Sequence, residues 1–338
     1  MDWRKGDGMK IVNLLDDFNH GGVTNGLGIF TEAEISAVAS VQTFAVQPDR
    51  LRAEAFDADM VITHFPPNWR RLPYLASLRQ RNPRARLVHV EHSYTENWFQ
   101  RHVTKPHRFK LMLSIALAKY DDVVCVSHAQ RNWLTQLTSL SAELFQTIYP
   151  YTNNPAIEAL APPLFQGGTP LTVGAFGRLH ECKGFDRLIA AFIAIGPNEG
   201  LELVIGGTGP EECSLKALAN GQPHIRFVGQ VLDVAGFLDG CQIIAVPSRN
   251  EAFGQVALEA RRAARPLLVS DIDGLPEQVS DCGLIIDCGN QHILKSALLL
   301  FKIMPLAHLS QMARRSAIEA KEQSVQGWLR LINGRAAE

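Results

Sequence analysis

Short, β-rich apolar segments recur along this chain, and each is followed by a stretch long enough to form a helix. In the first half, the predicted strands are residues 11–15, 41–46, 60–63, 87–90 and 123–126. Continuous apolar strands that alternate with helices indicate a parallel sheet covered on both faces. We therefore predict an α/β fold with a parallel sheet for this half.

The same pattern repeats in the second half, where the predicted strands are residues 171–176, 201–205, 225–228, 243–246, 267–270 and 284–286. Helices are expected at 185–195, 210–219 and 254–264. Between the halves, residues 150–170 hold five prolines and the pair Gly167-Gly168, and such breakers indicate a linker. We therefore expect one domain at residues 9–160 and a second at 168–321.

Length and charge agree with two soluble domains. A chain of 338 residues is too long for one core, and its 46% hydrophobic and 20% charged residues are typical of globular proteins. The net charge of −1 lacks the overall excess of positive charge that is typical of nucleic-acid-binding proteins. The six cysteines are scattered without zinc-ligand spacing and indicate a reducing compartment.

The N-terminal segment and the apolar runs bear on location. Residues 1–8 are polar, precede a second methionine at Met9 and lack the apolar core of a signal peptide. No apolar run approaches the ~20 residues that cross a bilayer. We expect the fold to begin at Lys10 and the protein to be cytoplasmic.

One segment departs from the balanced charge. Residues 70–110 contain ten basic residues against two acids, Glu91 and Glu96. A solvated cationic surface would explain such a segment. Since Trp98, Phe99, Phe109, Leu111 and Met112 lie among the cations, we instead expect peripheral contact with an anionic membrane or an acidic saccharide.

Ligands of open parallel sheets bind beyond the carboxyl ends of the strands, so the loops after the strands are the candidate sites. The loop after residues 11–15 carries Gly21 and Gly22, whose amides could approach an anion. The loop after 171–176 carries Arg178 and Lys183 between glycines. They are either two solvated cations or the ligands of one diphosphate, and their place after a strand favours the diphosphate.

Residues 247–260 form the most informative segment. Glu251 precedes a predicted helix and Glu259 lies within it, and carboxylates accept hydrogen bonds from sugar hydroxyls. The amides of Gly254, Gln255 and Val256 at the helix start suit a phosphate. By contrast, residues 205–210 do not fit the Gly-x-Gly-x-x-Gly pattern, since Glu212 stands at the third glycine position, so NAD and FAD are excluded.

These motifs, in this order, resemble the retaining glycosyltransferases of family four, the group 1 glycosyl transferases. The resemblance extends from about Lys10 to Leu331 and is strongest in the second half. Its strongest parts are Gly177-Arg178-Leu179 with Lys183-Gly184, Gly206–Glu211, Phe227-Val228-Gly229, Val246-Pro247-Ser248, Glu251 with Glu259, and Gly274–Glu277. It implies the GT-B fold, with two facing Rossmann-like domains and a last helix, about residues 322–334, that crosses back to the first domain.

The resemblance also implies the roles of individual residues. Arg178 and Lys183 would bind the donor diphosphate, and Glu259 the ribose. Glu251 would contact the transferred sugar, and the backbone at Val231 the nucleobase. In the first domain, Gly22 would cover the phosphates. His92 would lie beside the reacting sugar, although His64 and His89 compete for that role. Since His89 alternates with Val88 and Val90, we expect it to be a buried structural histidine.

The expected function is transfer of a sugar, with retention, from a UDP- or GDP-linked donor to a saccharide or lipid-linked acceptor in glycan biosynthesis. The resemblance implies same-face attack, in which fixed positive charge stabilises the departing diphosphate, so we expect no metal and no cofactor. The protein would act in the cytoplasm, at the inner face of the membrane. Two alternatives remain open: a catalytically silent nucleotide-sugar-binding module and a nucleotide-sugar epimerase of similar fold.

Overall fold

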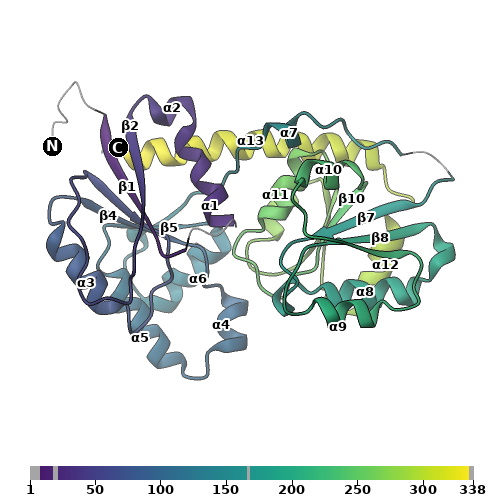
Figure 1. The fold of residues 1–338 in the computed structure, drawn as a ribbon, viewed down its shortest axis with the longest axis horizontal. Helices are drawn as coiled ribbons and strands as arrows, with labels where there is room; N and C mark the ends of the chain where they lie inside the picture. Colours follow the sequence, from purple (N-terminus) through teal and green to yellow (C-terminus); the bar gives the residue numbers. More distant parts are fainter. Residues whose placement is uncertain (1–7, 18–21, 166–167, 335–338) are drawn as a thin grey trace. The chain divides into compact units, whose positions relative to one another are not determined.

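The computed structural model describes residues 8–17, 22–165 and 168–334 (Figure 1). The chain divides into unit 1, Met1–Asn153 with Lys321–Glu338, and unit 2, Asn154–Ala320. Three sequence expectations lie outside the described residues: the segment before Met9 up to residue 7, Gly21 of the first glycine loop, and Gly167 of the linker.

Unit 1 contains a six-stranded parallel sheet in the order β2-β1-β3-β4-β5-β6. Its strands are β1 Met9–Leu15, β2 Ala39–Ala45, β3 Met60–Thr63, β4 Arg86–Glu91, β5 Asp122–Cys125 and β6 Phe145–Thr147. The helices that accompany them are α1 Gly22–Gly26, α2 Ala33–Ser36, α3 Leu72–Arg81, α4 Glu96–His102, α5 Pro106–Leu117 and α6 His128–Thr138. The strand order reverses between β1 and β3, which is the switch point of a flavodoxin-like sheet.

Unit 2 contains a second six-stranded parallel sheet in the order β9-β8-β7-β10-β11-β12. Its strands are β7 Leu171–Phe176, β8 Leu201–Gly206, β9 Ile225–Gly229, β10 Ile243–Val246, β11 Leu267–Ser270 and β12 Gly283–Ile286. Its helices include α7 Pro155–Glu158, α8 Phe185–Ile195, α9 Glu212–Leu218, α10 Val234–Asp239, α11 Gln255–Arg262 and α12 Gln291–Leu300. This is the Rossmann order, and its switch point lies between β7 and β10.

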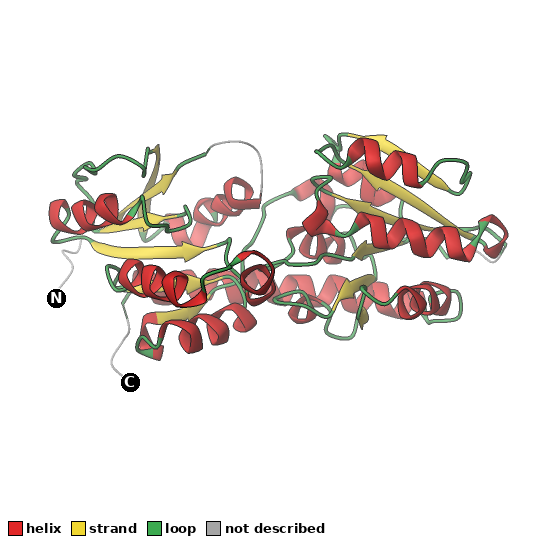
Figure 2. Cartoon of the chain, turned by 90° about the horizontal axis from the view of Figure 1, so that it is seen from below, coloured by secondary structure: helices red, strands yellow, loops and turns green. Residues whose placement is uncertain are grey.

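Apolar residues explain why both sheets are buried. All four residues of β3, of β5 and of β10 are buried, as expected of central parallel strands with helices on both faces (Figure 2). In unit 2, α8 contributes Phe185, Leu188, Ile189 and Phe192 to the core at helical spacing. The α/β fold with two parallel sheets is thereby confirmed.

The last helix, α13, extends over Leu306–Ile332, and the boundary between the units falls within it. The expected helix at about 322–334 is therefore only its final part. Trp328 of this part packs edge-on against Phe30 of unit 1, with ring centroids 4.8 Å apart. Ser324 Oγ donates to the Tyr149 carbonyl at 2.7 Å. These contacts explain why residues after Ala320 belong to unit 1.

The units divide after Asn153, which lies within the linker predicted at residues 150–170. The division comes earlier than the expected domain bounds of 160 and 168. The reason is α7, which begins at Pro155 and buries Ile157 completely in the core of unit 2. Glu158 of the same helix forms an ion pair with Arg262.

Within the described residues, no helix combines the length and the apolar character needed to cross a membrane.

Candidate functional site

The loops that follow β7 and β10 lie at the switch point of the unit 2 sheet. Ligands of this sheet type bind there, because the helices after the two adjacent strands lie on opposite faces and leave a crevice. The first loop carries Arg178 and Lys183, and the second carries Glu251. Three residues selected from the sequence therefore come from one pair of adjacent loops.

Lys183 and Glu251 are in direct contact. Lys183 Nζ donates to Glu251 Oε2 at 2.5 Å, and both side chains are mostly buried. Ser248 Oγ also donates to Glu251 Oε2, at 3.3 Å. Burial lowers the pKa of Lys183, but the Glu251 carboxylate more than offsets this, so its pKa lies above the ordinary value. The ammonium therefore stays charged.

Arg249 and Asp186 join the two loops. The Arg249 guanidinium donates to both carboxylate oxygens of Asp186, at 2.7 and 2.6 Å, and to the Glu181 carbonyl at 2.8 Å. The Arg249 amide donates to the Cys182 carbonyl at 2.7 Å. A bidentate pair of this kind fixes geometry as well as adding energy. It holds the segment before Lys183 against the loop of Glu251.

The backbone at Glu251 is fixed from a third loop. The Glu251 amide donates to Asp273 Oδ2 at 3.0 Å, and the Gly274 amide donates to the Glu251 carbonyl at 3.3 Å. Gly184 allows the first two loops to approach, since a Cβ there would lie 2.1 Å from the Pro247 carbonyl oxygen. The amide and the carbonyl of Glu251 are therefore both fixed by hydrogen bonds.

Arg178 differs from Lys183. It lies directly after Gly177 at the end of β7, its side chain is exposed, and it forms no hydrogen bond or ion pair with the part of the chain that the structure describes. An exposed guanidinium at a switch point retains its donors for a ligand such as a phosphate.

The start of α11 follows Glu251. Gly254 precedes the helix at φ +95°, a conformation that favours glycine, and Gln255 and Val256 form its first turn. Glu259 lies one turn further on. Burial raises the pKa of Glu259 to about 7, although Arg262 acts in the opposite direction. This carboxyl group therefore changes its charge near neutral pH.

Val231 lies beyond the end of β9. Its side chain packs so closely over Gly206 that a Cβ at Gly206 would lie 2.3 Å from Val231 Cγ2. Gly207 has φ +131°, and a Cβ there would lie 1.8 Å from the Gly177 carbonyl oxygen. These glycines are therefore needed for the close packing of the loops.

In unit 1, His92 belongs to a chain of hydrogen bonds. His92 directly follows β4 and is half-buried. Its Nε2 lies 3.1 Å from Nδ1 of His64, which directly follows β3. Nε2 of His64 lies 3.0 Å from Asn13 Oδ1 in β1. Burial lowers the pKa of His92 to about 4, although Glu91 opposes this, so the ring is neutral at pH 7.

His89 lies on the opposite face of the same sheet. Its Nδ1 lies 3.0 Å from Thr63 Oγ1, and its Nε2 lies 3.4 Å from Glu91 Oε2. Glu91 in turn accepts from the amides of Ser93 and Tyr94. His89 is almost fully buried, as expected from the sequence.

A cavity of about 30 Å³ lies beside His92 within unit 1 and is lined by His64, Val90, Phe30 and Trp328 among others. This is room for about one water molecule. Gly22 begins α1, and the next turn of that helix, Val23 and Gly26, lines the same cavity. Helix α1 and His92 therefore line one cavity in unit 1.

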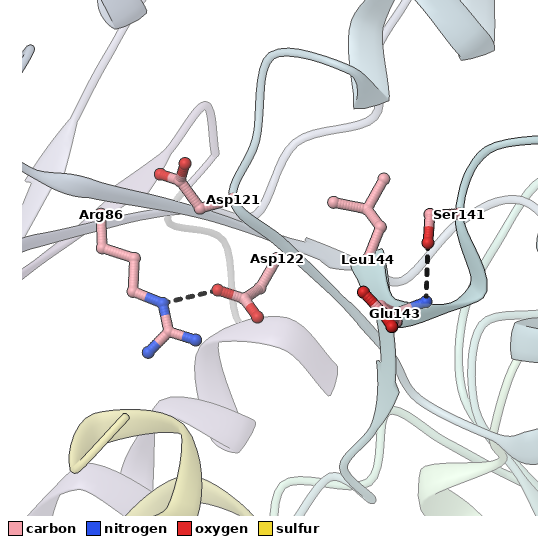
Figure 3. A pocket seen from close by; sticks show the side chains of 6 residues that line it. All are labelled: Arg86, Asp121, Asp122, Ser141, Glu143 and Leu144. Atoms are coloured by element: carbon pink, nitrogen blue, oxygen red, sulfur yellow. Dashed lines mark hydrogen bonds and ion pairs between the residues drawn. The ribbon is translucent and has the colours of Figure 1, made fainter. Parts of the chain in front are cut away.

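A larger pocket of about 440 Å³ opens at the amino end of β5 (Figure 3). Arg86 and Asp122 both line this pocket, and Arg86 Nε donates to Asp122 Oδ2 at 2.6 Å. Arg86 also donates to the Leu331 carbonyl, and Asp121 accepts from the Leu87 amide. Since these charged groups join structural elements and lie at the end opposite to the ligand-binding end, we assign the pocket no functional role.

Comparison with known proteins identifies the second unit. Residues 170–301 match the family model described as "Glycosyl transferases group 1". Residues 170–301 of unit 2 are thus similar to the group 1 glycosyl transferases. The match covers the loops of Arg178, Lys183, Glu251 and Glu259.

The curated relatives of this chain are remote. An uncharacterized glycosyltransferase of Methanocaldococcus jannaschii is 31% identical over 48% of this chain and 45% of the relative. A phosphatidyl-myo-inositol mannosyltransferase of Mycobacterium leprae is 28% identical over 78% of this chain and 69% of the relative. The alignments with the first curated relatives thus span less than half of their length.

Solved structures share the fold of both units. Anabaena HepE in complex with UDP and glucose has a TM-score of 0.72 and 18% identity, over 96% of this chain and all of HepE. Sucrose-phosphate synthase from Thermosynechococcus elongatus has a TM-score of 0.73 and 18% identity, over 96% of this chain and 99% of that one. The GT-B fold and the resemblance seen in the sequence are confirmed.

Several residues of the candidate site were not found from the sequence. Asn13, Arg249, Asp186 and Asp273 all hold a candidate residue in place. Asn13 had a visible signal, because it is the single polar residue among the apolar residues 11–15. Arg249 and Asp186 are 63 residues apart, and nothing in the sequence pairs them.

Proposed function

We propose that this chain is a retaining glycosyltransferase that transfers a sugar from a nucleoside-diphosphate sugar to a saccharide or lipid-linked acceptor. The observation that carries the proposal is the meeting of Lys183 and Glu251 at the switch point of unit 2, within the residues that match the family. One group suits phosphate and the other suits sugar hydroxyls.

In this proposal unit 2 binds the donor. Arg178, Lys183 and the amides of Gly254, Gln255 and Val256 would bind the diphosphate. Glu259 would accept hydrogen bonds from the ribose, and the backbone at Val231 would meet the nucleobase. Glu251 would bind hydroxyls of the transferred sugar, and His92 of unit 1 would lie beside the reacting sugar.

Lys183 and Arg178 would also act in the chemical step. As the bond to the sugar breaks, negative charge develops on the departing diphosphate, and fixed cations stabilise that charge without reorganising. In same-face attack, the departing phosphate accepts the proton of the acceptor hydroxyl. The proposed reaction needs no metal, because the cations and the helix-terminal amides supply the positive charge.

UDP and GDP remain the two candidate nucleotides. UDP is supported as the first to test, since HepE was solved with UDP and with UDP-glucose. An inositol-based or lipid-linked acceptor is supported by the names of two curated relatives, a D-inositol 3-phosphate glycosyltransferase and a phosphatidyl-myo-inositol mannosyltransferase.

The basic segment of residues 70–110 supports a further part of the proposal, docking at the inner face of an anionic membrane. Arg71, Arg79 and Arg86 pair with Asp16, Asp121 and Asp122, so the segment presents less positive charge than its composition implied. Arg101, Lys105 and Arg108 stay exposed beside Leu111 and Ile115, which are 55% and 38% exposed. Exposed cations beside exposed apolar groups suit shallow interfacial docking.

The experiment that tests the function is incubation with UDP- and GDP-sugars, followed by chromatography of the products. A glycosyltransferase slowly transfers sugar to water and releases nucleoside diphosphate. Binding without any release would support a silent module instead, and a changed sugar on an intact nucleotide would support an epimerase. Glu251→Gln is the matched variant, and we expect it to release no nucleoside diphosphate.

A further inference from the structure

The hydrogen bonds of Asn13, His64 and His92 form one chain across three neighbouring strands. Asn13 lies in β1, and β1 pairs with β3, which pairs with β4. The contacts of 3.0 Å from Asn13 to His64 and 3.1 Å from His64 to His92 are both normal hydrogen-bond lengths. The chain crosses the switch point of the unit 1 sheet and ends at His92.

The direction of the protons follows from Asn13. Its Oδ1 can only accept, so Nε2 of His64 carries the proton. A neutral imidazole has one N–H, so Nδ1 of His64 must accept. Nε2 of His92 therefore donates to it. This leaves Nδ1 of His92 without a proton and able only to accept.

These proton positions require both rings to be neutral, and the surroundings of the rings favour the neutral form. Asn13 is fully buried and His64 is nearly so. Burial, followed by the charges of His92 and His89, holds the pKa of His64 well below its ordinary value. The carboxylate of Glu91 follows His89 on the other face of the sheet and accepts from two backbone amides.

We propose that Asn13 and His64 are positioning residues that hold His92 in the Nε2–H tautomer, so that its Nδ1 accepts a hydrogen bond from a substrate hydroxyl. The use of that lone pair rests on the proposed function, whereas the tautomer itself does not. Such an atom selects a hydroxyl over a carbonyl or an ether oxygen, because only the hydroxyl can donate.

The reverse orientation of the Asn13 amide gives the opposite prediction. If Nδ2 donated to His64, every proton in the chain would shift, and Nδ1 of His92 would carry the proton. The two arrangements differ at a single observable atom.

The test is nitrogen NMR of the full chain with ¹⁵N-labelled histidine, with His92 assigned from the resonances that His92→Gln removes. We expect Nδ1 of His92 at the downfield position of an unprotonated ring nitrogen and Nε2 at the position of a protonated one. Asn13→Leu and His64→Leu should each produce a mixture of tautomers. His64→Gln should restore the single tautomer, because its amide can accept from His92 and donate to Asn13.

Thr63→Val is the matched control. It removes equally buried hydrogen bonds, those with His89 and Tyr120, on the opposite face of the sheet. It should leave the His92 resonances unchanged. A protonated Nδ1 in the wild type would overturn the proposal, as would a wild-type tautomer that persists in both leucine variants.

A kinetic arm tests the use of the lone pair. Against the best donor, His64→Leu should lower kcat about tenfold, the value of one hydrogen bond, with little change in the KM of the donor. His64→Gln should recover most of this loss. If the wild type turns over no donor, the proposed function fails. The NMR experiment still decides whether His92 has the proposed tautomer, because it does not depend on turnover. An unchanged kcat in His64→Leu overturns the catalytic use.

Discussion

Lys183 Nζ lies 2.5 Å from Glu251 Oε2, although the two residues are 68 positions apart in the sequence. The cation proposed to bind the diphosphate is thus paired with the carboxylate proposed to bind the sugar. A bound donor would present phosphate to one and hydroxyls to the other, and so would replace this ion pair with two separate interactions.

The first prediction concerns Glu251→Gln. Without the carboxylate, Lys183 loses the partner that competes with phosphate. The affinity for free UDP or GDP should therefore stay the same or rise by up to about fivefold, since an accessible ion pair is worth about 1 kcal/mol at most. Turnover of the nucleotide sugar should fall at least about tenfold.

Calorimetry and product release measure these two effects. Glu181→Gln is the matched control, because it removes an exposed acid from the same loop and leaves the Lys183–Glu251 pair intact. Weaker binding of free nucleotide in Glu251→Gln, with turnover unchanged, would refute the assigned roles.

The second prediction is a pH dependence from Glu259. Burial raises its pKa to about 7, and only the ionised form accepts hydrogen bonds from both ribose hydroxyls with full strength. Affinity for the nucleotide should therefore increase from pH 6 to pH 8. Glu259→Gln should bind more weakly and lose this increase.

The comparison with Glu259→Gln is essential, because a terminal phosphate also ionises near pH 6 and adds its own dependence. Titration of UMP and UDP against both proteins at three pH values separates the contributions. Parallel pH curves for the wild type and the variant would contradict the prediction.

The third prediction concerns the acid stability of unit 1. His92 has a pKa of about 4 in the folded chain, below its unfolded value, so the unfolded state binds the proton first as the pH falls. Between pH 6.5 and pH 4 this destabilises the folded state by about 1.4 kcal/mol per pH unit for each such histidine. His92→Gln should therefore reduce the slope by about one proton.

Urea unfolding followed by tryptophan fluorescence measures this slope. All five tryptophans of the chain, Trp3, Trp69, Trp98, Trp133 and Trp328, belong to unit 1, so the signal reports that unit. His180→Gln, in unit 2, is the control and should leave the slope unchanged. Equal slopes for the wild type and His92→Gln would show that His92 is protonated equally in both states.

The fourth prediction concerns the basic segment. The wild type should sediment with anionic vesicles at low salt, less at high salt, and not with neutral vesicles. Replacing both Lys105 and Arg108 with alanine should weaken this binding about thirtyfold, since each cation near the surface contributes about 1 kcal/mol.

Leu111→Ser should also weaken vesicle binding, because the residue is 55% exposed beside these cations. Leu218→Ser is its control, as a leucine 43% exposed in unit 2. A wild type that stays in the supernatant with anionic vesicles at low salt would exclude membrane docking and favour an acceptor in solution.

The sequence predicted those elements that bury continuous apolar residues. Strands 60–63, 171–176, 243–246 and 267–270 and helix 185–195 have the bounds expected from their apolar residues. Strand β6, Phe145–Thr147, was missed because only Phe145 in it is apolar. The first part of α13 was missed because its polar stretch around Arg314–Glu319 shows no clear apolar face.

The candidate site was predictable only where its residues lie in local motifs. Arg178 and Lys183 lie in one segment between glycines, and Glu251 and Glu259 lie in a second segment, before and within one predicted helix. Each pair is therefore visible in a short stretch of sequence. The groups that fix them come from distant segments, as with Asp273 at the Glu251 amide and Asn13 at His64. Such contacts depend on strand order, which the sequence pattern alone does not provide.

The most direct test of the central claim is calorimetric titration of UDP and GDP into the wild type and into variants of Arg178 and Lys183. We expect Arg178→Ala and Lys183→Ala each to weaken binding of the preferred nucleotide by about 1.5–3 kcal/mol, the range of hydrogen bonds to charged groups. Lys216→Ala, which removes a cation paired with Glu212 elsewhere in unit 2, should leave binding unchanged. Wild-type affinity for both UDP and GDP in the Arg178→Ala/Lys183→Ala double variant would contradict the account.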